Sequence, residues 1–394
     1  MQTAYQPIVS LPDGAVVGFE ALSRWPSLNM PDPRTVFDHA AATHKLDALD
    51  QLCIESAIDG ALSGQQPRGT MLLVNSEPES AYVRPTRNST VARGHDELQL
   101  VYELTERGLL AHPHALLQKV AAARADGFAI ALDDVGAHPD SLALLDVVCP
   151  DVVKLDIDLI QAEPRIGEAR TFAAVLAHHE RTGAAILAEG IETNEHLEHA
   201  VALGATLGQG YLFGDAGPID RHVAGTSPLP AKSADSAPTM APSPFDLVTE
   251  QSSLRTARKP ILTAFTRHIE SQARHAADPP MVLTALQKAE YFTAGTRRHY
   301  DEIAETSPLV GIFGQDLPAN LGARIRGVAL DPSDPLCAEW TVVVLGPHTA
   351  AALLGRERID NDSAADDDRR FDFVVTYDRS LVTMAARNLL DRMY

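Results

Sequence analysis

Residues 128–134 read FAIALDD, a short apolar run that ends in two adjacent carboxylates, Asp133 and Asp134. Short apolar runs without clear alternation are typical of strands that are buried on both faces. Further runs of this kind end in single polar residues along the first half of the chain. These residues are Glu20, Asn75, Glu103, Lys154 and Glu189, and Gln209 follows a shorter run.

Segments with helical spacing separate the apolar runs. Residues 113–126 place Leu116, Leu117, Val120 and Ala123 on one face, and residues 163–181 follow the same pattern. Strands that alternate with helices predict a parallel sheet with crossover helices. Most intervals between the polar residues are 20 to 35 residues long, which suits one strand and one helix. We therefore predict a TIM-like (β/α)₈ barrel in which these side chains meet at the carboxyl ends of the strands.

The polar residues at the strand ends make an all-oxygen set of candidate metal ligands. Carboxylates and an amide, without cysteine or histidine, favour Mg²⁺ or Mn²⁺ over Zn²⁺. Adjacent carboxylates repel each other unless cations lie between them, so Asp133 and Asp134 predict two ions that share one ligand. Two such ions are a common device for phosphodiester hydrolysis, and Lys154 would hold the attacking water or the developing charge.

Eight short motifs in this part of the chain occur in the order of one known family. They are YQPIV, GFEALSRW, VNSEP, YELTE, LDDVG, VVKLD, AEGIE and GQGYLF. With these motifs, residues 1–218 resemble the EAL-domain family. The resemblance implies a TIM-like barrel that hydrolyses the bacterial messenger cyclic di-GMP to linear pGpG with two Mg²⁺ or Mn²⁺ ions.

The resemblance also implies roles for single residues. Lys154 and Gln209 match residues that position the attacking water. Gln6 and Arg24 match groups that hold the dinucleotide, although either could instead brace the barrel mouth; an arginine suits phosphate or guanine because its planar fork pairs bidentately. The residues that match ligands of the first metal are Glu20, Asn75, Glu103 and Asp133, and those that match ligands of the second are Asp133, Asp134 and Glu189.

The loop after Asp134 departs from the family's pattern. Active members usually read DDFGTGYSSL, whereas residues 133–142 read DDVGAHPDSL. Pro139 fixes φ and removes a backbone donor, so this loop cannot make the same hydrogen bonds. In the family the loop is anchored by the residue that Glu106 matches, and it links the second metal to the interface of a homodimer. We expect the change to reduce turnover more than substrate binding.

The composition predicts in which compartment the protein is located and which surfaces it does not bind. The chain has no apolar run near 18 residues, and its N-terminus leads directly into the first predicted strand, so we expect a soluble cytoplasmic protein without a signal peptide or a membrane span. Cys53, Cys149 and Cys337 lie far apart and are interpreted as reduced thiols. A formal net charge of −20 argues against a general nucleic-acid or membrane surface.

Residues 217–244 mark a division of the chain, because they are dense in proline, alanine and serine and contain almost no large apolar residues. We predict a barrel domain over residues 1–218, a linker over 219–244 and a second α/β domain over 245–394. In the second domain we expect a helix with Ile261, Phe265 and Ile269 on one face and a final helix capped by Ser380. Strands are expected at 309–313, 340–346 and 371–377.

Three stretches of the second domain follow another family. They are Asp334-Pro335-Leu336, Glu339-Trp340 with the nearby VVVLGP, and RRFDFVVTYDRSLV near the C-terminus. With them, residues 245–394 resemble the DICT domain, a sensory module found beside cyclic-di-GMP enzymes and two-component proteins. We see no nucleophile, base and metal constellation here and assign regulation through an unknown ligand or through dimerisation. Glu339 and Trp340 are candidates for lining a pocket, although a tryptophan that opens a valine-rich strand is more often core.

Three functions remain open at this point. The first is an active phosphodiesterase controlled by its C-terminal domain, which is favoured because every metal and water-positioning residue is present. The second is a cyclic-di-GMP receptor that binds without turnover because of the altered loop. The third is an interaction protein built on a degenerate barrel that no longer binds cyclic di-GMP. It is disfavoured because degeneration would be expected to remove metal ligands as well as loop residues.

Overall fold

The computed structural model of this protein describes residues 1–11, 13–105, 110–137, 139–162, 166–219, 223, 224, 229, 241–248, 254–322, 324–358 and 366–394, with the backbone alone at 139–141 and 166. These residues form two compact units, one built around a barrel and the other around an open sheet. Within these ranges, no helix combines the length and the apolar character that crossing a bilayer requires.

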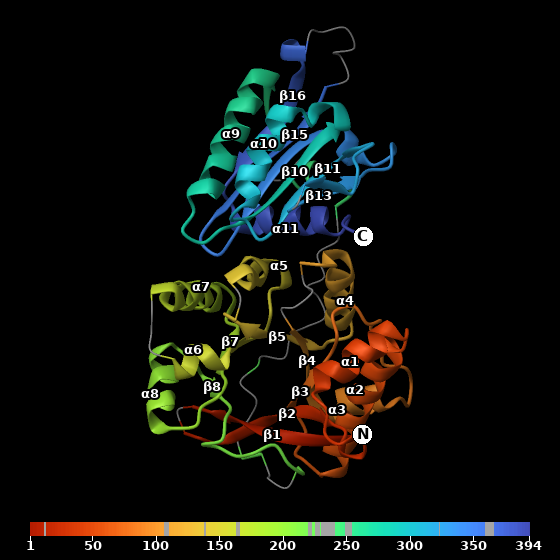
Figure 1. Ribbon diagram of the computed structural model, residues 1–394, viewed down its shortest axis with the longest axis vertical. Coiled ribbons are helices and arrows are strands. Elements are labelled where there is room, and N and C mark those ends of the chain that lie inside the picture. Colours follow the sequence, from red (N-terminus) through yellow and green to blue (C-terminus); the bar gives the residue numbers. More distant parts are fainter. Residues whose placement is uncertain are drawn as a thin grey trace. The chain divides into compact units, whose positions relative to one another are not determined.

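Eight strands close into a barrel in the first unit, and the labels of these strands other than β6 follow one another around a ring in Figure 1. They are β1 (Gln2–Ser10), β2 (Val16–Arg24), β3 (Thr70–Asn75), β4 (Leu98–Thr105), β5 (Ala129–Val135), β6 (Val152–Leu155), β7 (Ala185–Ala188) and β8 (Leu207–Gly208). Strands β2 to β8 run parallel, and the predicted TIM-like barrel is confirmed. The exception is β1, which is antiparallel to β2 and β8. Only a short turn joins β1 to β2, and such a turn permits antiparallel pairing alone.

Helices follow most of the parallel strands. They are α1 (Pro33–Ala42), α2 (Leu46–Ser63), α3 (Thr90–Glu97), α4 (Pro113–Ala125), α5 (Leu145–Val148), α6 (Ile157–Gln161), α7 (Ile166–Thr182) and α8 (Asn194–Ala202). The helix predicted at 113–126 is α4, on which Leu116, Val120 and Ala123 are buried. The helix predicted at 163–181 is α7, and residues 163–165 lie outside the described residues.

Apolar side chains fill the barrel interior, and one of them comes from the predicted linker. Leu229 is buried in this cluster, the amide of Ala224 donates to Val16 O at 3.0 Å, and the amide of Val223 donates to Gln66 Oε1 at 3.3 Å. The predicted linker therefore begins on the barrel, while residues 220–222, 225–228 and 230–240 lie outside the described residues. The other members of the cluster are Ile8, Val17, Met71, Leu73, Val101, Ala131, Val152, Ala185, Leu187 and Leu207.

An eight-stranded sheet forms the centre of the second unit, in the order β12-β13-β11-β10-β14-β15-β16-β9. Its strands are β9 (Arg255–Arg258), β10 (Met281–Lys288), β11 (Val310–Gln315), β12 (Asn320–Gly322), β13 (Ile325–Ala329), β14 (Glu339–Leu345), β15 (Ala350–Glu357) and β16 (Arg370–Thr376). Helices α9 (Lys259–His275) and α10 (Ala294–Ala304) lie side by side over the sheet (Figure 1), and α11 (Arg379–Leu390) packs against β14 and β15. The separate second domain is confirmed, and β11, β14 and β16 are the strands that the sequence predicts.

Two details of the predicted helices in this unit are wrong. Ile261 is exposed, because the buried stripe of α9 runs through Leu262 and Ile269. Helix α11 begins one residue before Ser380, since the carboxylate of Asp378 accepts from the backbone and caps it. The sequence reasoning also misses β10 and β15, whose alanine- and leucine-rich runs suit a helix as well as a strand.

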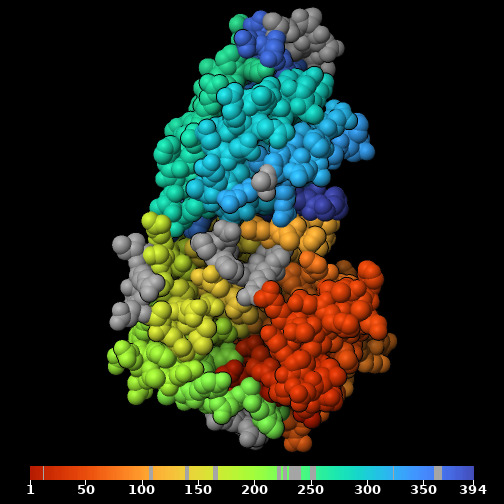
Figure 2. Space-filling view, in the orientation of Figure 1, coloured from red at the N-terminus to blue at the C-terminus, as the bar shows by residue number. Residues whose placement is uncertain are grey.

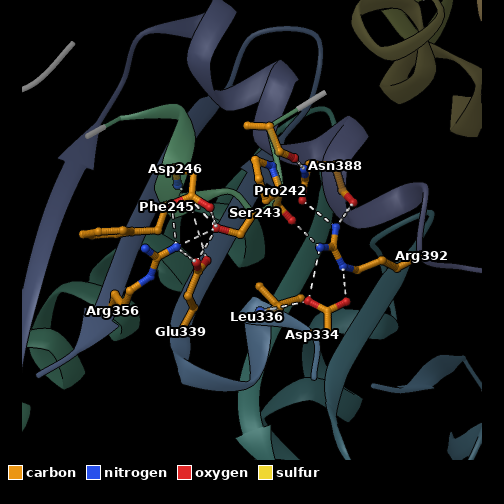
Figure 3. Close-up of polar contacts among 11 residues, drawn as sticks. Pro242, Ser243, Phe245, Asp246, Asp334, Leu336, Glu339, Arg356, Asn388 and Arg392 are labelled. Carbon is orange, nitrogen blue, oxygen red and sulfur yellow. Dashed lines mark hydrogen bonds and ion pairs between the residues drawn. The ribbon is translucent and has the colours of Figure 1, made fainter. Parts of the chain in front are cut away.

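A polar network holds residues 241–246 on the second unit (Figure 3). The buried Glu339 accepts hydrogen bonds from the Ser243 hydroxyl and from Phe245 N, the latter at 3.2 Å. Arg356 donates to Glu339 and to Asp246 at 2.7 Å each, and its guanidinium lies 4.7 Å from the centre of the Phe245 ring. Side chains of α11 and of the residues after it bind the carbonyls at 241 and 242. The contacts of this unit therefore extend to residue 241.

Candidate metal centre

The side chains predicted at the strand ends meet at one rim of the barrel. Most of them lie near or just past the carboxyl ends of their strands, and parallel strands bring these ends together. Glu20 lies in the middle of β2. Glu20, Glu103 and Lys154 are buried there. The remaining members of the group are Asn75, Asp133, Asp134, Glu189 and Gln209.

Lys154 on β6 lies at the centre of this group. Its Nζ is 2.5 Å from Glu103 Oε1, 2.8 Å from Asp133 Oδ1, 2.8 Å from Glu189 Oε1 and 3.5 Å from Glu20 Oε2. Burial alone would lower the pKa of Lys154, but the four carboxylates together raise it well above its usual value. Lys154 is therefore a permanent positive charge at the rim.

Asp133 and Asp134 serve the same site although neighbours on a strand ordinarily face opposite ways. The pairing of β5 with β6 shifts between Leu132 and Val135, and Asp134 has a left-handed backbone with a φ of 53°. A bulge of this kind takes one residue out of the alternation. Oxygens of Asp133, Asp134 and Glu189 consequently lie within 4.8 Å of one another.

The group carries more negative charge than one lysine neutralises. Burial and the neighbouring Asp133 carboxylate raise the pKa of Glu103 well above its usual value, and burial raises the pKa of Glu189 to about 8. Five carboxylates and one ammonium give a formal charge of −4, which two divalent cations would balance. The five carboxylates are those of Glu20, Glu103, Asp133, Asp134 and Glu189.

Unpartnered oxygens in this group fit bound cations. Among the described residues, Glu103 Oε2 and Gln209 Oε1 are buried and accept no hydrogen bond. A buried acceptor without a partner costs free energy, and a hard cation satisfies it. The available ligand atoms are carboxylate and amide oxygens, which suit Mg²⁺ or Mn²⁺. The residues present therefore fit a pair of hard divalent cations.

Three amide side chains complete the rim. Gln209 Nε2 donates to Glu20 Oε2 at 2.7 Å and to Gln6 Oε1 at 3.0 Å. Asn75 Nδ2 lies 3.4 Å from Glu20 Oε1. Because β1 is antiparallel to β2, Gln6 pairs directly opposite Glu20. These bonds fix the side chains of Glu20 and Gln209.

A cleft of about 550 Å³ opens beside the carboxylates. Rim residues including Glu20 and Asp134 line it together with residues of α1 and α2. Arg24 at the end of β2 also lines the cleft. In the described part of the chain its guanidinium bonds only Ser23 O, at 3.0 Å, so most of its donors remain available to a ligand.

The sequence reasoning misses Asp50 on α2, which is buried and lines the same cleft. Asp50 accepts from Ser76 Oγ at 3.1 Å and from Glu77 N at 3.0 Å, and Lys119 Nζ lies 3.5 Å away. It thereby holds the loop that follows Asn75. The feature of the sequence that could have identified Asp50 is its position, as an acidic residue, on the apolar face of its helix.

Part of the predicted loop lies outside the described residues, as do Glu106 and His138. Of the remainder, Val135 is buried and Gly136 has a φ of 106°. A Cβ on Gly136 would lie 2.2 Å from Leu159 Cδ1. Glycine is therefore required two residues after the carboxylate pair.

The comparison with protein families covers both units. The model of the EAL domain matches residues 1–216, more than half of the chain. This chain belongs to the EAL domain family. Residues 245–358 match a second family model, the sensory domain in diguanylate cyclases and two-component systems, DICT. The two resemblances seen in the sequence are thus confirmed.

Similar proteins match about half of this EAL-domain protein. The probable cyclic di-GMP phosphodiesterase PdeG of Escherichia coli is 30% identical over 224 residues, which are 53% of this chain and 43% of that protein. The cyclic di-GMP phosphodiesterase RocR of Pseudomonas aeruginosa is 28% identical over 222 residues, 53% of this chain and 55% of that protein. A solved structure, the Klebsiella pneumoniae BlrP1 manganese and cyclic-di-GMP complex, is 29% identical with a TM-score of 0.46 over 55% of each chain.

Proposed function

We propose that this protein is a metal-dependent phosphodiesterase that hydrolyses cyclic di-GMP to linear pGpG. The observation that supports this most strongly is the group of five carboxylates around Lys154, whose excess charge matches two divalent cations. Two relatives that carry the name cyclic di-GMP phosphodiesterase support the same substrate. Metal-assisted hydrolysis is also the reaction for which a site of this composition is suited.

The proposed centre has two metal positions that share Asp133. Glu20, Asn75 and Glu103 would complete the first position. Asp134 and Glu189 would complete the second. When bound, two Mg²⁺ or Mn²⁺ ions would neutralise the scissile phosphate and favour ionisation of the attacking water.

The remaining rim residues would bind and orient the reactants. Lys154 would hold the attacking water and stabilise the developing negative charge, because its ammonium stays protonated among the carboxylates. Gln209, which directly follows β8, would orient the same water. Gln6 and Arg24 would hold the dinucleotide, and the cleft beside Arg24 supports this placement. Glu106 would anchor the loop after Asp134.

The proposal extends to the whole protein. We infer a homodimer formed through the EAL domain and a second domain, joined by a linker over residues 219–244, that regulates hydrolysis in response to a ligand. The match of residues 245–358 to a sensory domain supports this regulatory role.

The test is hydrolysis by the purified full chain with Mn²⁺, followed by chromatographic separation of cyclic di-GMP and pGpG. We expect pGpG from the wild type and none from Glu20→Ala or Asp133→Asn. Asp59→Asn is the matched control, because Asp59 is an exposed carboxylate that pairs with Arg93 away from the rim. Tight binding of cyclic di-GMP by dimeric protein, without product over hours, would overturn the enzyme and identify a receptor.

A further inference from the structure

The second unit contains a cavity of about 680 Å³. It is lined by residues of α9 and α10 together with residues of β10 and the start of β14. Both helices form part of the surface of this unit, where they lie side by side (Figures 1 and 2). The volume is typical of sites that take small organic molecules.

One wall of the cavity is apolar and aromatic. Leu286, Tyr300 and Trp340 line it, and Tyr300 is buried. The ring of Trp340 meets that of Phe371 edge to face at a centroid distance of 5.7 Å, which fixes its plane. Glu339, the other residue predicted to line a pocket, faces away from the cavity because neighbours on β14 alternate. A rigid wall of this kind suits a planar ring.

Two residues that line the cavity each carry a buried polar atom with no partner among the described residues. These atoms are Thr266 Oγ1 and Trp340 Nε1. Thr266 is only 9% exposed, and its hydroxyl makes no bond to the preceding turn of α9. An indole N–H can only donate, so it needs an acceptor that the chain does not provide. A ligand with acceptor atoms would satisfy both groups.

Positive charge exceeds negative charge around the cavity. Asp366 pairs with two of the cationic side chains, and Arg274 pairs with Glu302 at 2.9 Å. Arg267 is exposed and has no ion-pair or hydrogen-bond partner in the described part of the chain. The charged lining residues are Lys259, Arg267, Arg274 and Arg369 against Glu270 and Asp366.

The buried carboxylate of Glu270 is already satisfied within the wall. It accepts from Tyr300 Oη at 2.5 Å and from His299 Nε2 at 2.8 Å. The hydrogen bond to Glu270 raises the pKa of His299, which favours the protonated form of this imidazole. The uncommitted charge that faces a ligand is therefore cationic.

We propose that this cavity binds a small planar aromatic ligand that carries an anionic group. The ring lies against Trp340, an acceptor of the ligand binds the indole N–H or Thr266, and the anion pairs with Arg267. Free aromatic acids and nucleotides share this chemistry. Binding here does not depend on the proposed phosphodiesterase activity.

The experiment uses the full chain and a reporter inside the cavity. The chain has two tryptophans, Trp25 and Trp340, so Trp25→Phe leaves Trp340 as the sole tryptophan. Benzoate and GMP are titrated as the two arms of the test while the fluorescence of Trp340 is followed. Benzamide lacks the anionic group and acetate lacks the ring, so both serve as comparators.

We expect saturable quenching of Trp340 by benzoate or by GMP, with benzamide and acetate at least about tenfold weaker. Arg267→Gln weakens binding about tenfold or more, because it removes a charge-assisted bond. Thr266→Val weakens it about threefold, as expected for one neutral hydrogen bond. Arg298→Gln leaves affinity unchanged, since Arg298 is exposed on α10 and does not line the cavity.

Three results would overturn the proposal, given variants whose circular dichroism matches that of the wild type. One is no saturable quenching by benzoate or GMP up to about 5 mM, near the weak end of specific binding. Another is equal affinity for benzamide and benzoate. The last is an equal effect of Arg267→Gln and Arg298→Gln.

Discussion

At the scale of single residues, Lys154 is the central positive charge of the candidate metal centre. One ammonium lies within 3.5 Å of four carboxylates and cannot balance them, so part of the acid group holds protons in the absence of cations. The pKa of Glu189, raised to about 8 by burial, is the measurable consequence. Protons and divalent cations therefore compete for the same oxygens.

This competition predicts that Mn²⁺ affinity rises with pH and levels off above pH 8. Below the raised pKa of Glu189 the cation must displace a proton, which costs up to about tenfold in affinity per pH unit. The affinity for Mn²⁺ is measured by titration between pH 6.5 and 9, followed by electron paramagnetic resonance. Glu189→Gln should weaken binding and flatten the profile. An affinity that does not change with pH in the wild type would contradict the protonated state of Glu189.

Replacement of Lys154 by methionine separates catalysis from metal binding. Removing the ammonium leaves the carboxylates more negative, so Mn²⁺ binds at least as tightly as in the wild type. The turnover number falls about 100-fold or more, because no group then holds the attacking water or the developing charge. Lys45→Met is the control, since Lys45 is exposed. Equal loss of metal binding and turnover would show that Lys154 is only structural.

At the scale of elements, the sequence predicts that these side chains lie together, because they end apolar runs. Glu103, Asp133 and Lys154 lie near the carboxyl ends of β4, β5 and β6, and parallel strands bring these ends together without further information. Two features were not predictable in this way. The antiparallel β1 depends on a tight turn. The bulge at Asp134 depends on a left-handed backbone, which aspartate tolerates but which an aspartate in the sequence does not predict.

The loop after this bulge carries a prediction of its own. Restoring Thr-Gly-Tyr-Ser at residues 137–140 raises the turnover number several-fold with little change in affinity for cyclic di-GMP, because Pro139 no longer fixes the backbone. Pro139→Ala alone tests the effect of the fixed backbone and should give part of the increase in turnover number. Steady-state hydrolysis and equilibrium binding measure the two quantities. A turnover number that does not change would mean that the loop is not limiting.

Glu339 and Trp340, adjacent residues at the start of β14, face opposite sides of the second sheet. Glu339 binds the segment around Ser243, while Trp340 lines the cavity. The sequence points to both residues but cannot assign them to faces, since the partner of Glu339 lies 96 residues away.

Glu339→Ala should destabilise the second unit by about 3 kcal/mol, the range for breaking a buried ion pair, because Arg356 and Ser243 lose their partner. Urea unfolding followed by Trp340 fluorescence in the Trp25→Phe background measures the free energy of unfolding. Glu305→Ala is the matched control at an exposed glutamate. A similar small effect of both variants would show that the network around Glu339 does not stabilise the second unit.

At the scale of the whole molecule, the division into two domains follows from composition. The proline- and serine-rich stretch predicts a linker, but composition cannot reveal that Leu229 packs in the barrel or that residue 241 bonds to the second unit. These contacts need partners from distant parts of the chain. The folded units therefore extend into both ends of the linker predicted over 219–244.

Limited proteolysis tests this boundary. Broad-specificity protease at low ratio should cut first between residues 230 and 240, because the residues on both sides bond to folded units. Mass spectrometry of the first fragments locates the cut. First cleavage inside residues 1–216 or 254–394 would contradict the two-domain organisation.

The central claim is that five carboxylates around Lys154 form a centre for two divalent cations. The most direct measurement is the number of Mn²⁺ ions bound per chain, counted by equilibrium dialysis above pH 8, where Glu189 is ionised. We predict two ions for the wild type and about one for Asp134→Asn, because only the second position uses Asp134. A wild-type chain that binds no Mn²⁺, or one ion regardless of Asp134, would contradict it.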